Sequence, residues 1–379
     1  AASDNGGDLV IIGVPTEIKE SERRVGLTPG SAHDLISRGH SVIVQSGAGD
    51  GSGFTDHEYE AVGAKLVPDA TDVFASAEMI VKVKEPQAGE RAMLRPHHTL
   101  FTFLHLAADR PQTEELMASG CTAIAYETIT DDEGRLPLLA PMSQVAGRLS
   151  IQAGAHYLEA PAGGAGLLLG GVPGVAPAKV TVIGGGQVGR NAIMMAVGLG
   201  ADVTVLDRNP AVLEDLNNHF GPSLRTVYST AATLDEYVVD ADLVIGAVLV
   251  PGAAAPKLVS ADMISRMRPG SVVVDVAIDQ GGSIETAHPT THTDPVYIVD
   301  GVVHYCVANM PGAVPRTSTL ALNNATLPRI AQLAEGPLDA LRSDPHLRRG
   351  LNVHAGQLTE AAVADSLDLP FVAPDIAIG

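Results

Sequence analysis

The chain has 379 residues, enough for about two domains with large hydrophobic cores. Hydrophobic residues make up 45% of it, with 40 Gly, 25 Pro and no Trp, which is typical of a folded α/β protein and excludes a disordered or fibrous one. The formal net charge of −20 repels phosphate groups, so nucleic acid and anionic membranes are not expected partners.

The opening residues, AASDNGGDLV, lack a basic region followed by an apolar one, and no apolar run reaches the roughly 18 residues of a membrane span. We therefore expect no signal peptide, no transmembrane segment and a cytoplasmic location. The two cysteines, Cys121 and Cys306, have apolar neighbours and no metal-ligand spacing. Buried free thiols and no metal site are the expectation.

Strand-like and helix-like patterns alternate through the first third of the chain. In chain order they are a strand LVIIGVP (9–15), a helix SAHDLISRG (31–39), a strand HSVIVQSG (40–47), a helix DHEYEAVGA (56–64), and strands EMIVKVKEP (78–86), HTLFTFLHL (98–106) and CTAIAYET (121–128). Alternation of this kind indicates parallel strands joined by right-handed crossovers.

A second series of elements follows. An apolar helix with scattered polar residues (143–160) leads into a Gly/Pro-rich segment (161–177) that we interpret as a surface connection. A strand–helix–strand pattern comes next, and then further strands; these lie at 178–209, 241–249, 271–279 and 302–312. The remaining residues are mostly helical, contain no new α/β unit, and are expected to pack on the first domain.

The segment VTVIGGGQVGRNA has the spacing G-x-G-x-x-G at Gly184, Gly186 and Gly189, between an apolar strand and a helical run. Gly184 allows a tight turn, Gly186 lets the backbone approach a pyrophosphate, and Gly189 lets the helix pack closely on the strand. The next strand ends in Asp207, which can bind a ribose diol and would repel a 2′-phosphate. NAD is therefore favoured over NADP, although the neighbouring Arg208 could hold that phosphate; a glycine-rich turn without a ligand is the alternative.

These patterns predict an α/β fold with two Rossmann-like, doubly wound parallel sheets joined by long helices. We expect a discontinuous substrate (catalytic) domain at residues 1–140 and 310–379. The NAD-binding domain is expected at residues 141–309.

Two short segments concentrate positive charge in this anionic chain. KVKEP places Lys82 and Lys84 two residues apart, on one face of the predicted strand, and KESERRVGLTP adds Arg23 and Arg24 after the first strand. An arginine can bind a carboxylate through two parallel bonds, and a lysine adds a movable point charge. We expect Lys82 and Arg23 to be surface charges, whereas Lys84 and Arg24 fit a surface role and an anion site equally well.

Candidate acid–base groups lie at the ends of two predicted strands. His105 is in an apolar run, which favours a buried core histidine, whereas His97 and His98 are expected to be exposed in a turn. Asp279 ends the predicted strand SVVVDVAID, just before two glycines. A turn residue and an acid–base group at the mouth of a cleft are both consistent with this position. Asp275, earlier in the same strand, is assigned a structural role.

Many segments in register resemble the L-alanine dehydrogenase family, over residues 9–365. The matching segments are GVPTEIKESERRVGLTPG, KVKEP, LFTFLHLA, TAIAYET, PLLAPMSQVAGRLS, GVPGVAPAKVTVIGGGQVG, GLGADVTVLD, VDVAIDQGG and HYCVANMPGAVPRTST. The resemblance implies oxidative deamination of L-alanine by NAD to pyruvate and ammonium, with the reverse amination, in a homo-hexamer. The implied partners are these small molecules alone.

The resemblance also implies roles for individual residues. Arg24 and Lys84 match substrate-binding positions, and His105 and Asp279 match catalytic ones. The implied cofactor contacts are Ser143, Gly184, Gly186, Gln187, Val188, Gly189, Asp207, Leu249, Ile278, Asp279, Asn309 and Met310. Residues of both domains are expected to meet around the nicotinamide ring.

Two other functions fit parts of this pattern. The NAD(H)-binding subunit of a proton-translocating transhydrogenase is similar in fold, but the segments AIDQGG and PMSQVAGRL favour the dehydrogenase. A non-catalytic NAD-sensing module would keep the glycines and Asp207. Such a module would have no need of His105, Asp279 and the two cations together.

Overall fold

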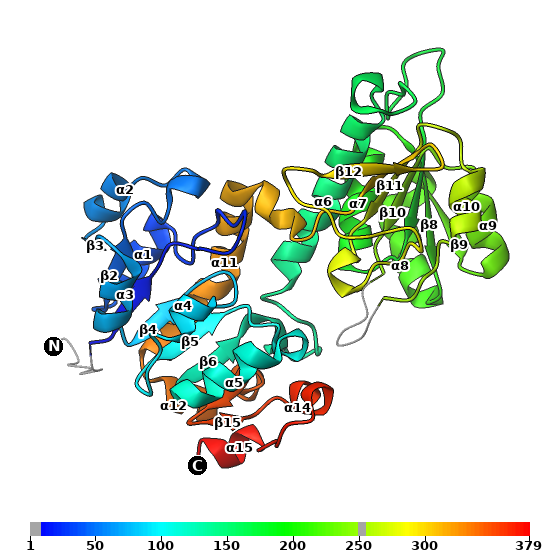
Figure 1. The fold of residues 1–379 in the computed structure, drawn as a ribbon. Coiled ribbons are helices and arrows are strands. Elements are labelled where there is room, and N and C mark those ends of the chain that lie inside the picture. The colour runs from blue at the N-terminus through cyan, green and yellow to red at the C-terminus, as the bar shows by residue number, and fades with distance from the viewer. Residues whose placement is uncertain (1–8, 249–254) are drawn as a thin grey trace. The chain divides into compact units, whose positions relative to one another are not determined.

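The structure is a computed structural model that describes residues 9–248 and 255–379 (Figure 1). It divides into two compact units. Unit 1 comprises Ala1–Pro141 and Val314–Gly379, and unit 2 comprises Met142–Ala313. The C-terminal segment therefore belongs to the same unit as the N-terminal one.

Unit 1 contains an eight-stranded sheet with the order β15-β14-β6-β5-β4-β1-β2-β3. Its strands are β1 (Ile11–Val14), β2 (Ser41–Gln45), β3 (Lys65–Val67), β4 (Met79–Val81), β5 (Thr99–Thr102), β6 (Thr122–Ala125), β14 (Leu351–His354) and β15 (Gln357–Leu358). Strands β1 to β6 are parallel, whereas β14 pairs antiparallel with both β6 and β15. The expectation that the C-terminal segment would only pack on this domain is therefore incomplete, because the segment extends the sheet by two short strands.

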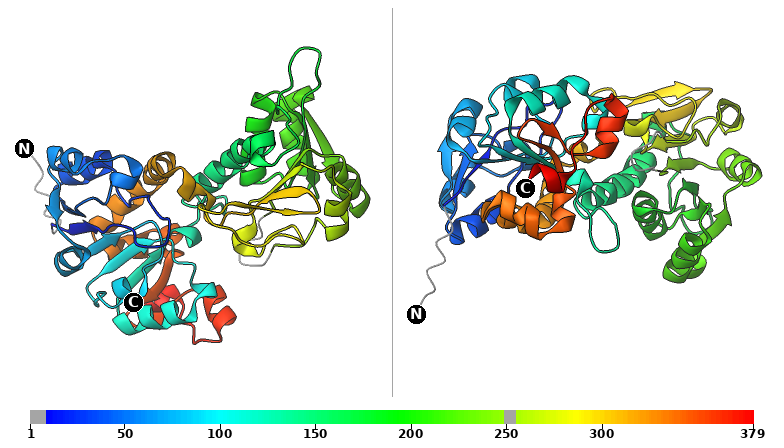
Figure 2. Two further views of the ribbon diagram at one scale, coloured as in Figure 1. Left: turned by 45° about the horizontal axis from the view of Figure 1, so that its top comes forward. Right: turned by 90° about the horizontal axis from the view of Figure 1, so that it is seen from below.

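Helices cover the sheet of unit 1 on both faces (Figure 2). They are α1 (Pro29–Ser37), α2 (Asp56–Ala61), α3 (Ala70–Ser76), α4 (Ala88–Arg91), α5 (Arg110–Ser119), α11 (Pro315–Ala334), α12 (Pro337–Ser343), α13 (Pro345–Arg348), α14 (Ala361–Leu367) and α15 (Pro374–Ala377), with the short 3₁₀ helices η1 (Asp50–Ser52), η2 (Leu106–Ala108) and η3 (Tyr126–Thr128). Helix α11 is tied to the loop after β1, because Asn323 accepts a bond from the Thr28 N–H (2.8 Å) and donates one to the Gly26 carbonyl (2.7 Å). The C-terminal segment thus supports a loop that carries predicted site residues.

Unit 2 contains a seven-stranded sheet with the order β12-β13-β11-β10-β7-β8-β9, in which only β12 runs antiparallel to its neighbour. Its strands are β7 (Lys179–Ile183), β8 (Asp202–Asp207), β9 (Leu224–Tyr228), β10 (Leu243–Gly246), β11 (Val272–Asp275), β12 (Val296–Val299) and β13 (Val302–Tyr305). Its helices are α6 (Ala140–Tyr157), α7 (Gln187–Gly198), α8 (Pro210–Phe220), α9 (Ala231–Val239) and α10 (Ala261–Arg266), with the 3₁₀ helices η4 (Ala160–Ala162), η5 (Gly221–Ser223), η6 (Ile278–Gln280) and η7 (Met310–Ala313).

Helix α7 lies on one side of this second sheet, and α9 and α10 lie on the other (Figure 1). The strands between them are apolar, and all four residues of β10 and of β11 are buried. The predicted fold of two doubly wound parallel sheets is confirmed. So are the two buried free thiols, Cys121 and Cys306.

Several strands end earlier than the sequence predicts, and three of them precede predicted site residues. Strand β4 stops at Val81, β5 at Thr102 and β11 at Asp275. The predicted site residues beyond them therefore lie in turns at the carboxyl edges of the two sheets, where open α/β folds bind ligands. Within the two described ranges, no helix is both long enough and apolar enough to span a lipid bilayer.

Candidate active site

The carboxyl edge of the unit 1 sheet collects three of the predicted site residues. Arg24 follows β1, Lys84 follows β4 and His105 follows β5. Strands β1 and β4 are neighbours, and the strand order reverses between them, since β2 and β3 lie on one side and β5 and β6 on the other. Such a reversal is where an open α/β sheet forms its ligand crevice.

Arg24 is buried, with 2% of its side chain exposed, and is held by Glu22. Its Nε and Nη2 donate to the two oxygens of the Glu22 carboxylate at 2.7 and 2.6 Å, and its backbone N–H donates to the same group at 3.0 Å. The neighbouring Arg23 is exposed, as predicted. Burial and bidentate pairing fix the direction of the Arg24 guanidinium, so the surface interpretation of this residue is wrong.

The loop that carries Arg24 packs directly against the end of β4. A Cβ atom added to Gly26 would lie 2.5 Å from the Val81 carbonyl oxygen and 3.2 Å from the Lys82 nitrogen. Only a glycine allows this approach. The loop after β1 and the bend after β4 are therefore in contact.

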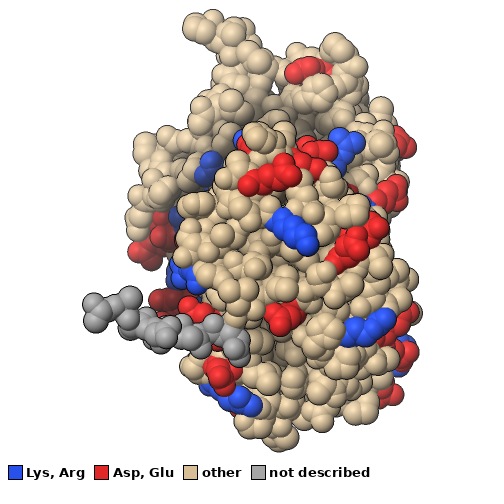
Figure 3. Space-filling view, turned by 90° about the vertical axis from the view of Figure 1, so that its left-hand side faces the viewer, with Lys and Arg blue, Asp and Glu red and all other residues tan. Residues whose placement is uncertain are grey.

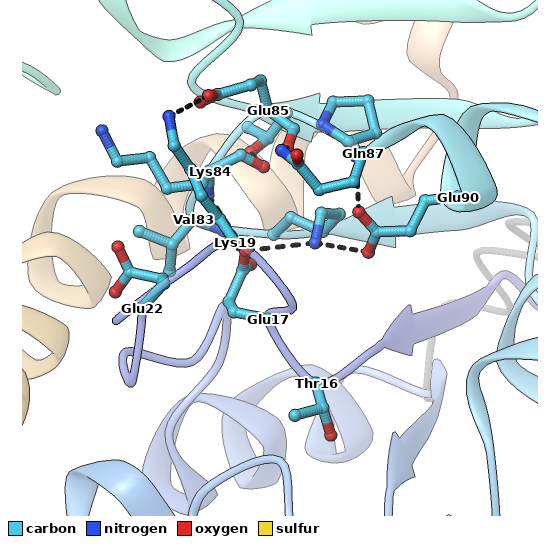
Figure 4. Close-up of polar contacts among 12 residues, drawn as sticks. Thr16, Glu17, Lys19, Glu22, Val83, Lys84, Glu85, Gln87 and Glu90 are labelled. Atoms are coloured by element: carbon cyan, nitrogen blue, oxygen red, sulfur yellow. Dashed lines mark hydrogen bonds and ion pairs between the residues drawn. The ribbon is translucent and has the colours of Figure 1, made fainter.

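Lys82 is fully buried, so its prediction as a surface charge is wrong. It lies just after β4 rather than within it, and its Nζ binds the carboxylates of Glu17 (3.1 Å) and Glu90 (2.7 Å) (Figure 4). Lys84 also lies beyond the strand, is partly buried, and donates its backbone N–H to Glu17 (3.3 Å). The two lysines therefore do not share a strand face: one is buried in an ion cluster, and the other lies on the bend above it.

Burial and charge act together on this cluster. Loss of water raises the pKa of Glu17, although Lys82 and the Val83 N–H oppose that shift. Burial alone would lower the pKa of Lys82, but the attraction of Glu17 and Glu90 outweighs it and raises that pKa. The ammonium form of Lys82 is therefore the stable one at neutral pH.

His105 lies in a turn at the end of β5 and has 49% of its side chain exposed, so the prediction of a core histidine is wrong. Its backbone is left-handed, with φ 50° and ψ 42°, a conformation that is rare for a residue with a side chain. The Glu127 carboxylate accepts the backbone N–H groups of Leu104 (3.1 Å) and His105 (2.6 Å). The His105 ring lies parallel to that of Phe103, with centroids 5.7 Å apart. This support presents the imidazole at the same edge as Lys84.

His98 is the histidine that the structure buries, and its prediction as an exposed residue is wrong. Its Nδ1 accepts the Arg95 N–H (2.9 Å), and its Nε2 lies 2.9 Å from the Phe74 carbonyl oxygen. Burial lowers its pKa. His98, which directly precedes β5, is therefore packed in the interior, whereas His97 is exposed as predicted.

In unit 2, the three glycines of the predicted dinucleotide turn have the conformations that their roles require. Gly184 has a φ of 98°, and a Cβ there would lie 3.0 Å from the Ala247 carbonyl oxygen. A Cβ on Gly189 would lie only 1.8 Å from the Gly184 oxygen, whereas nothing lies within 4 Å of the corresponding point on Gly186. The turn is therefore tight at the first glycine, open at the second and closely packed at the third.

Asp207 lies beside this turn, at the end of β8. Its carboxylate accepts the N–H groups of Gly185 (2.7 Å) and Asn209 (2.8 Å). The neighbouring Arg208 is exposed. The carboxylate is thus in contact with the glycine turn, which fits the recognition of a ribose next to a pyrophosphate.

Helix α7 begins at Gln187, and its first residues contact α6. A Cβ on Gly147 of α6 would lie 2.2 Å from the Val188 carbonyl oxygen, so the two helices touch at this point. Ser143 is one turn earlier on α6 and is partly buried. It therefore lies on the face of α6 that approaches the start of α7. Val188 is buried, which leaves its backbone as the group available to a ligand.

Asp279 lies in the 3₁₀ helix η6, is exposed, and precedes two left-handed glycines, Gly281 and Gly282. The prediction that the strand continues to residue 279 is wrong, because β11 ends at Asp275 and the chain turns there. The Asp275 carboxylate accepts the N–H groups of Ala277 (3.1 Å), Ser283 (2.8 Å) and Ile284 (3.0 Å). Burial raises the pKa of Asp275, and these bonds oppose the shift. Asp275 thus closes the loop that carries Asp279, in agreement with its predicted structural role.

The other predicted contacts of unit 2 surround Asp279. Asn309 has a left-handed backbone (φ 59°) and donates its N–H to the Asp279 carboxylate at 3.3 Å. Its neighbour Met310 is buried, as is Ile278. Leu249, which follows β10, lies outside the described residues. Apart from Ser143 on α6, the predicted cofactor residues that are described lie at or next to the carboxyl ends of β7, β8, β11 and β13, all parallel strands of one sheet.

The sequence patterns do not identify the carboxylates that hold these turns. They are Glu17, Glu22, Glu90 and Glu127, and each accepts a backbone N–H group near a predicted site residue. The available signal was their position, because Glu17 and Glu22 follow β1 and Glu127 follows β6, in the segments that connect strand ends to the next element. Their acidity alone does not separate them from surface residues.

The described residues of unit 2 have the features that a dinucleotide site requires. The space beyond Gly186 is open, α7 begins there with no side chain capping its N-terminus, and Asp207 lies beside the turn. On the face of the molecule in Figure 3, acidic and basic side chains are interspersed. Each buried cation of unit 1 is paired with carboxylates, Arg24 with Glu22 and Lys82 with Glu17 and Glu90.

Comparison with known proteins gives a consistent result. The family model described as "Alanine dehydrogenase/PNT, N-terminal domain" matches residues 13–146, and "Alanine dehydrogenase/PNT, C-terminal domain" matches residues 150–361. The alanine dehydrogenase of Halomonas elongata is 61% identical over 369 residues, which is 97% of this chain and all of that protein. That of Bacillus subtilis is 54% identical over 372 residues, covering 97% of this chain and 98% of that protein.

Solved structures agree. An L-alanine dehydrogenase structure with 54% identity has a TM-score of 0.92 and covers 94% of this chain and 99% of its own. A transhydrogenase from Sinorhizobium meliloti has 28% identity and a TM-score of 0.80, covering 93% of this chain and 99% of its own. From the matched domains and these relatives, the chain belongs to the alanine dehydrogenase/PNT family.

Proposed function

We propose that this chain is an L-alanine dehydrogenase: L-alanine, NAD⁺ and water give pyruvate, ammonium, NADH and a proton, and the reaction also runs in reverse. The single observation that supports this most strongly is the 61% identity to an alanine dehydrogenase along the full length of that relative. The structure adds a chemical reason, since one sheet edge of unit 1 holds a buried arginine, a lysine and an imidazole.

Unit 1, which makes up most of the proposed substrate domain (residues 1–140 and 310–379), binds the carboxylate of alanine or pyruvate. Arg24 is directed by Glu22 and supplies a fixed planar cation, while Lys84 supplies a point charge on a longer, more mobile side chain. In an anionic protein, this pair offsets the repulsion that a carboxylate meets at the surface. Glu22 is essential to the arrangement, because it removes the rotational freedom of the guanidinium.

Unit 2 (Met142–Ala313), which contains nearly all of the proposed NAD-binding domain (residues 141–309), binds the dinucleotide. Backbone N–H groups at the start of α7 face the pyrophosphate, and Asp207 binds the adenosine ribose and disfavours NADP. Contacts from Ser143, Gln187, Val188, Leu249, Ile278, Asn309 and Met310 complete the proposed set. NAD, when bound, would accept the hydride from Cα of alanine, and the substrate nitrogen would release a proton to solvent, so that the Cα–N single bond becomes the double bond of an imine.

His105 and Asp279 carry the proton steps of this proposal. In the deamination direction, Asp279 orients the water that attacks the imine carbon and takes a proton from it. His105 donates a hydrogen bond to the oxygen that becomes the pyruvate carbonyl, and it exchanges a proton with that oxygen. General acid–base groups of this kind each contribute roughly 10²–10⁴ in rate.

The test is NADH formation from L-alanine by the purified protein, followed by absorbance. We expect Asp279→Asn and His105→Asn each to lower kcat by about 10²–10⁴ while leaving the NADH dissociation constant nearly unchanged. His97→Asn and Asp294→Asn are matched controls, because both side chains are exposed and lie in the same units. A wild-type protein without alanine activity would rule out the function, and an Asp279→Asn protein with near-normal turnover would rule out that role alone.

Two further properties belong to the same proposal. The resemblance to the family supports a homo-hexamer in the cytoplasm, which light scattering after gel filtration and cell fractionation can test. Transfer of hydride from NADPH to a thionicotinamide analogue of NAD tests the alternative transhydrogenase activity. Its absence, together with alanine turnover, separates the two enzyme types.

A further inference from the structure

The backbone of the bend at residues 82–86, which carries Lys84, is bonded at almost every polar group. Among N–H groups, that of Lys82 donates to the Phe101 carbonyl (3.1 Å), that of Val83 to Glu17 (2.6 Å) and that of Lys84 to Glu17 (3.3 Å). Buried backbone groups require such partners, but here a side-chain carboxylate takes the place that a neighbouring strand would otherwise fill. The bend therefore has one defined conformation.

The carbonyl groups of the same bend are equally engaged. That of Lys82 accepts the Tyr126 hydroxyl (2.8 Å), that of Val83 the Phe103 N–H (3.2 Å) and that of Lys84 the Thr102 hydroxyl (2.9 Å). These donors come from β5, from the residue just beyond it, and from the segment after β6. The bend is thus fixed on one side by the sheet and on the other by Glu17.

Glu17 is itself held by the buried ion cluster. Its side chain is 1% exposed and accepts three bonds, two from the bend and one from the Lys82 ammonium. Lys82 binds Glu90 in turn, and Glu90 accepts the Gln87 N–H at 2.8 Å (Figure 4). The cluster therefore connects the loop after β1 with both ends of the bend.

A buried cluster of one cation and two carboxylates is a poor way to gain stability. Removing three charges from water carries a large cost, and well-packed apolar residues commonly stabilise a fold as well or better. What a charged cluster adds is direction, since its bonds require defined atoms at defined distances. The cluster lies next to Lys84, which is proposed to bind substrate, so its directed bonds can orient that residue.

The same loop also holds the second proposed cation. Glu17 and Glu22 are both in the loop after β1; Glu17 fixes the backbone of Lys84, and Glu22 fixes the guanidinium of Arg24. Gly26 then packs this loop against the end of β4. A displacement of the loop would therefore alter both cations together.

We propose that Glu17, Lys82 and Glu90 are positioning residues that set the direction of the Lys84 side chain for the substrate carboxylate. This inference rests on the proposed function and deepens it, because it names residues that act on substrate affinity through Lys84. It also predicts which kinetic constant responds: the KM values for alanine and pyruvate, with little change in the affinity for NADH.

The experiment is a double-mutant cycle of wild type, Glu17→Gln, Lys84→Met and the double variant. Glu17→Gln keeps the size of the side chain but removes a charged acceptor, so we expect the KM for pyruvate to rise about tenfold. Lys84→Met should raise that KM more. In the Lys84→Met background, Glu17→Gln should add no more than about twofold, since residues that act through one another are not additive.

Arg329→Met is the matched control, because it removes a partly buried ion pair with Asp344 in the same unit. It should lower the melting temperature without changing the KM for pyruvate. Glu90→Gln provides a second variant if Glu17→Gln folds poorly, with a smaller rise in KM expected because Glu90 reaches the bend through Lys82 and Gln87. NADH affinity, measured by calorimetry, should stay within about twofold for all variants.

The outcomes separate the two proposals. If Lys84→Met raises the KM but Glu17→Gln leaves it unchanged, or raises it by the same factor in both backgrounds, the positioning role is wrong and the proposed function stands. If Lys84→Met leaves the KM unchanged, the substrate role of Lys84 is wrong, and the positioning proposal falls with it.

Discussion

The carboxyl edge of the sheet in unit 1 is built from charged side chains, whereas that of unit 2 is built from glycines and backbone N–H groups. In unit 1, the pairs and clusters around Arg24 and Lys82 are almost fully buried. In unit 2, the glycine turn is open at Gly186, where nothing lies within 4 Å of an added Cβ. The six parallel strands have the same order in both sheets, but the two edges differ in chemistry.

The difference follows from the ligands that we propose. A small carboxylate offers few contacts, so a strong and directed cation is needed to hold it in an anionic protein. A dinucleotide offers a long backbone, so many N–H groups and close approach are sufficient. Both edges nevertheless use the same internal support, a carboxylate that accepts backbone N–H groups: Glu17 in unit 1, and Asp207 and Asp275 in unit 2.

Among the variants that test this difference between the two sheet edges, the largest effect is expected at Gly189. An alanine there would place Cβ 1.8 Å from the Gly184 oxygen, which must move the turn. We expect Gly189→Ala to weaken NADH binding by about 10- to 100-fold, in line with the cost of overpacking. Gly198→Ala is the control, since nothing lies within 4 Å of its added Cβ. Equal affinities in the two variants, measured by calorimetry, would contradict the backbone-approach model.

A smaller effect is expected at Asp207. Asp207→Asn keeps an oxygen that can accept the Gly185 N–H but removes the charge that would repel a 2′-phosphate. We expect the KM for NAD to rise about fivefold and the preference for NAD over NADP to narrow, as a charge-assisted bond becomes a neutral one. Steady-state kinetics with both dinucleotides gives the ratio. An unchanged preference would assign the ribose contact to another residue.

The smallest effect is expected for Asp344, a carboxylate that binds backbone N–H groups but lies far from both sheet edges. Asp344 caps α13 by accepting the N–H groups of His346 (2.9 Å) and Leu347 (3.0 Å). Asp344→Ala should lower the free energy of unfolding by about 1 kcal/mol and leave kcat and KM unchanged. A change in the kcat or KM for alanine would contradict the expectation that a carboxylate far from both sheet edges affects stability alone.

The pH dependence of this loss has a defined sign. Burial would raise the pKa of Asp344, but the bonds from Leu347, Gln332 and Arg329 outweigh it and lower that pKa. The stabilisation is therefore present above the ordinary pKa of an aspartate and is lost as the pH falls through the lowered value. Melting temperatures of wild type and Asp344→Ala should converge in that acidic range, and a constant difference would contradict the assignment.

Much of the fold could be predicted because it depends on local patterns. The alternation of apolar strands and helices indicated two parallel sheets, and the spacing of Gly184, Gly186 and Gly189 indicated the turn that the structure contains. Strand ends were less predictable. The apolar runs continue past the last paired residue, so His105 and Asp279 were placed in strands, whereas His105 directly precedes η2 and Asp279 lies in η6.

The burial of individual polar groups could not be predicted from local sequence. Lys82 and His98 were expected at the surface, and His105 in the core, and all three expectations are wrong. Whether a polar side chain is buried depends on partners that are distant in the chain, such as Glu17 for Lys82, which is 65 residues away. The sequence of one segment does not identify the distant residues that will contact it.

By itself, the sequence determined the periodicities, the glycine spacing and the residue types at each strand end, because these depend on side-chain chemistry along a short stretch of chain. Only the tertiary structure decided which charges are buried and paired, and which backbone groups they hold. The physical reason is that burial of a charge is tolerated only where opposite charges and N–H groups converge on it, and that convergence is made by the packing of distant segments.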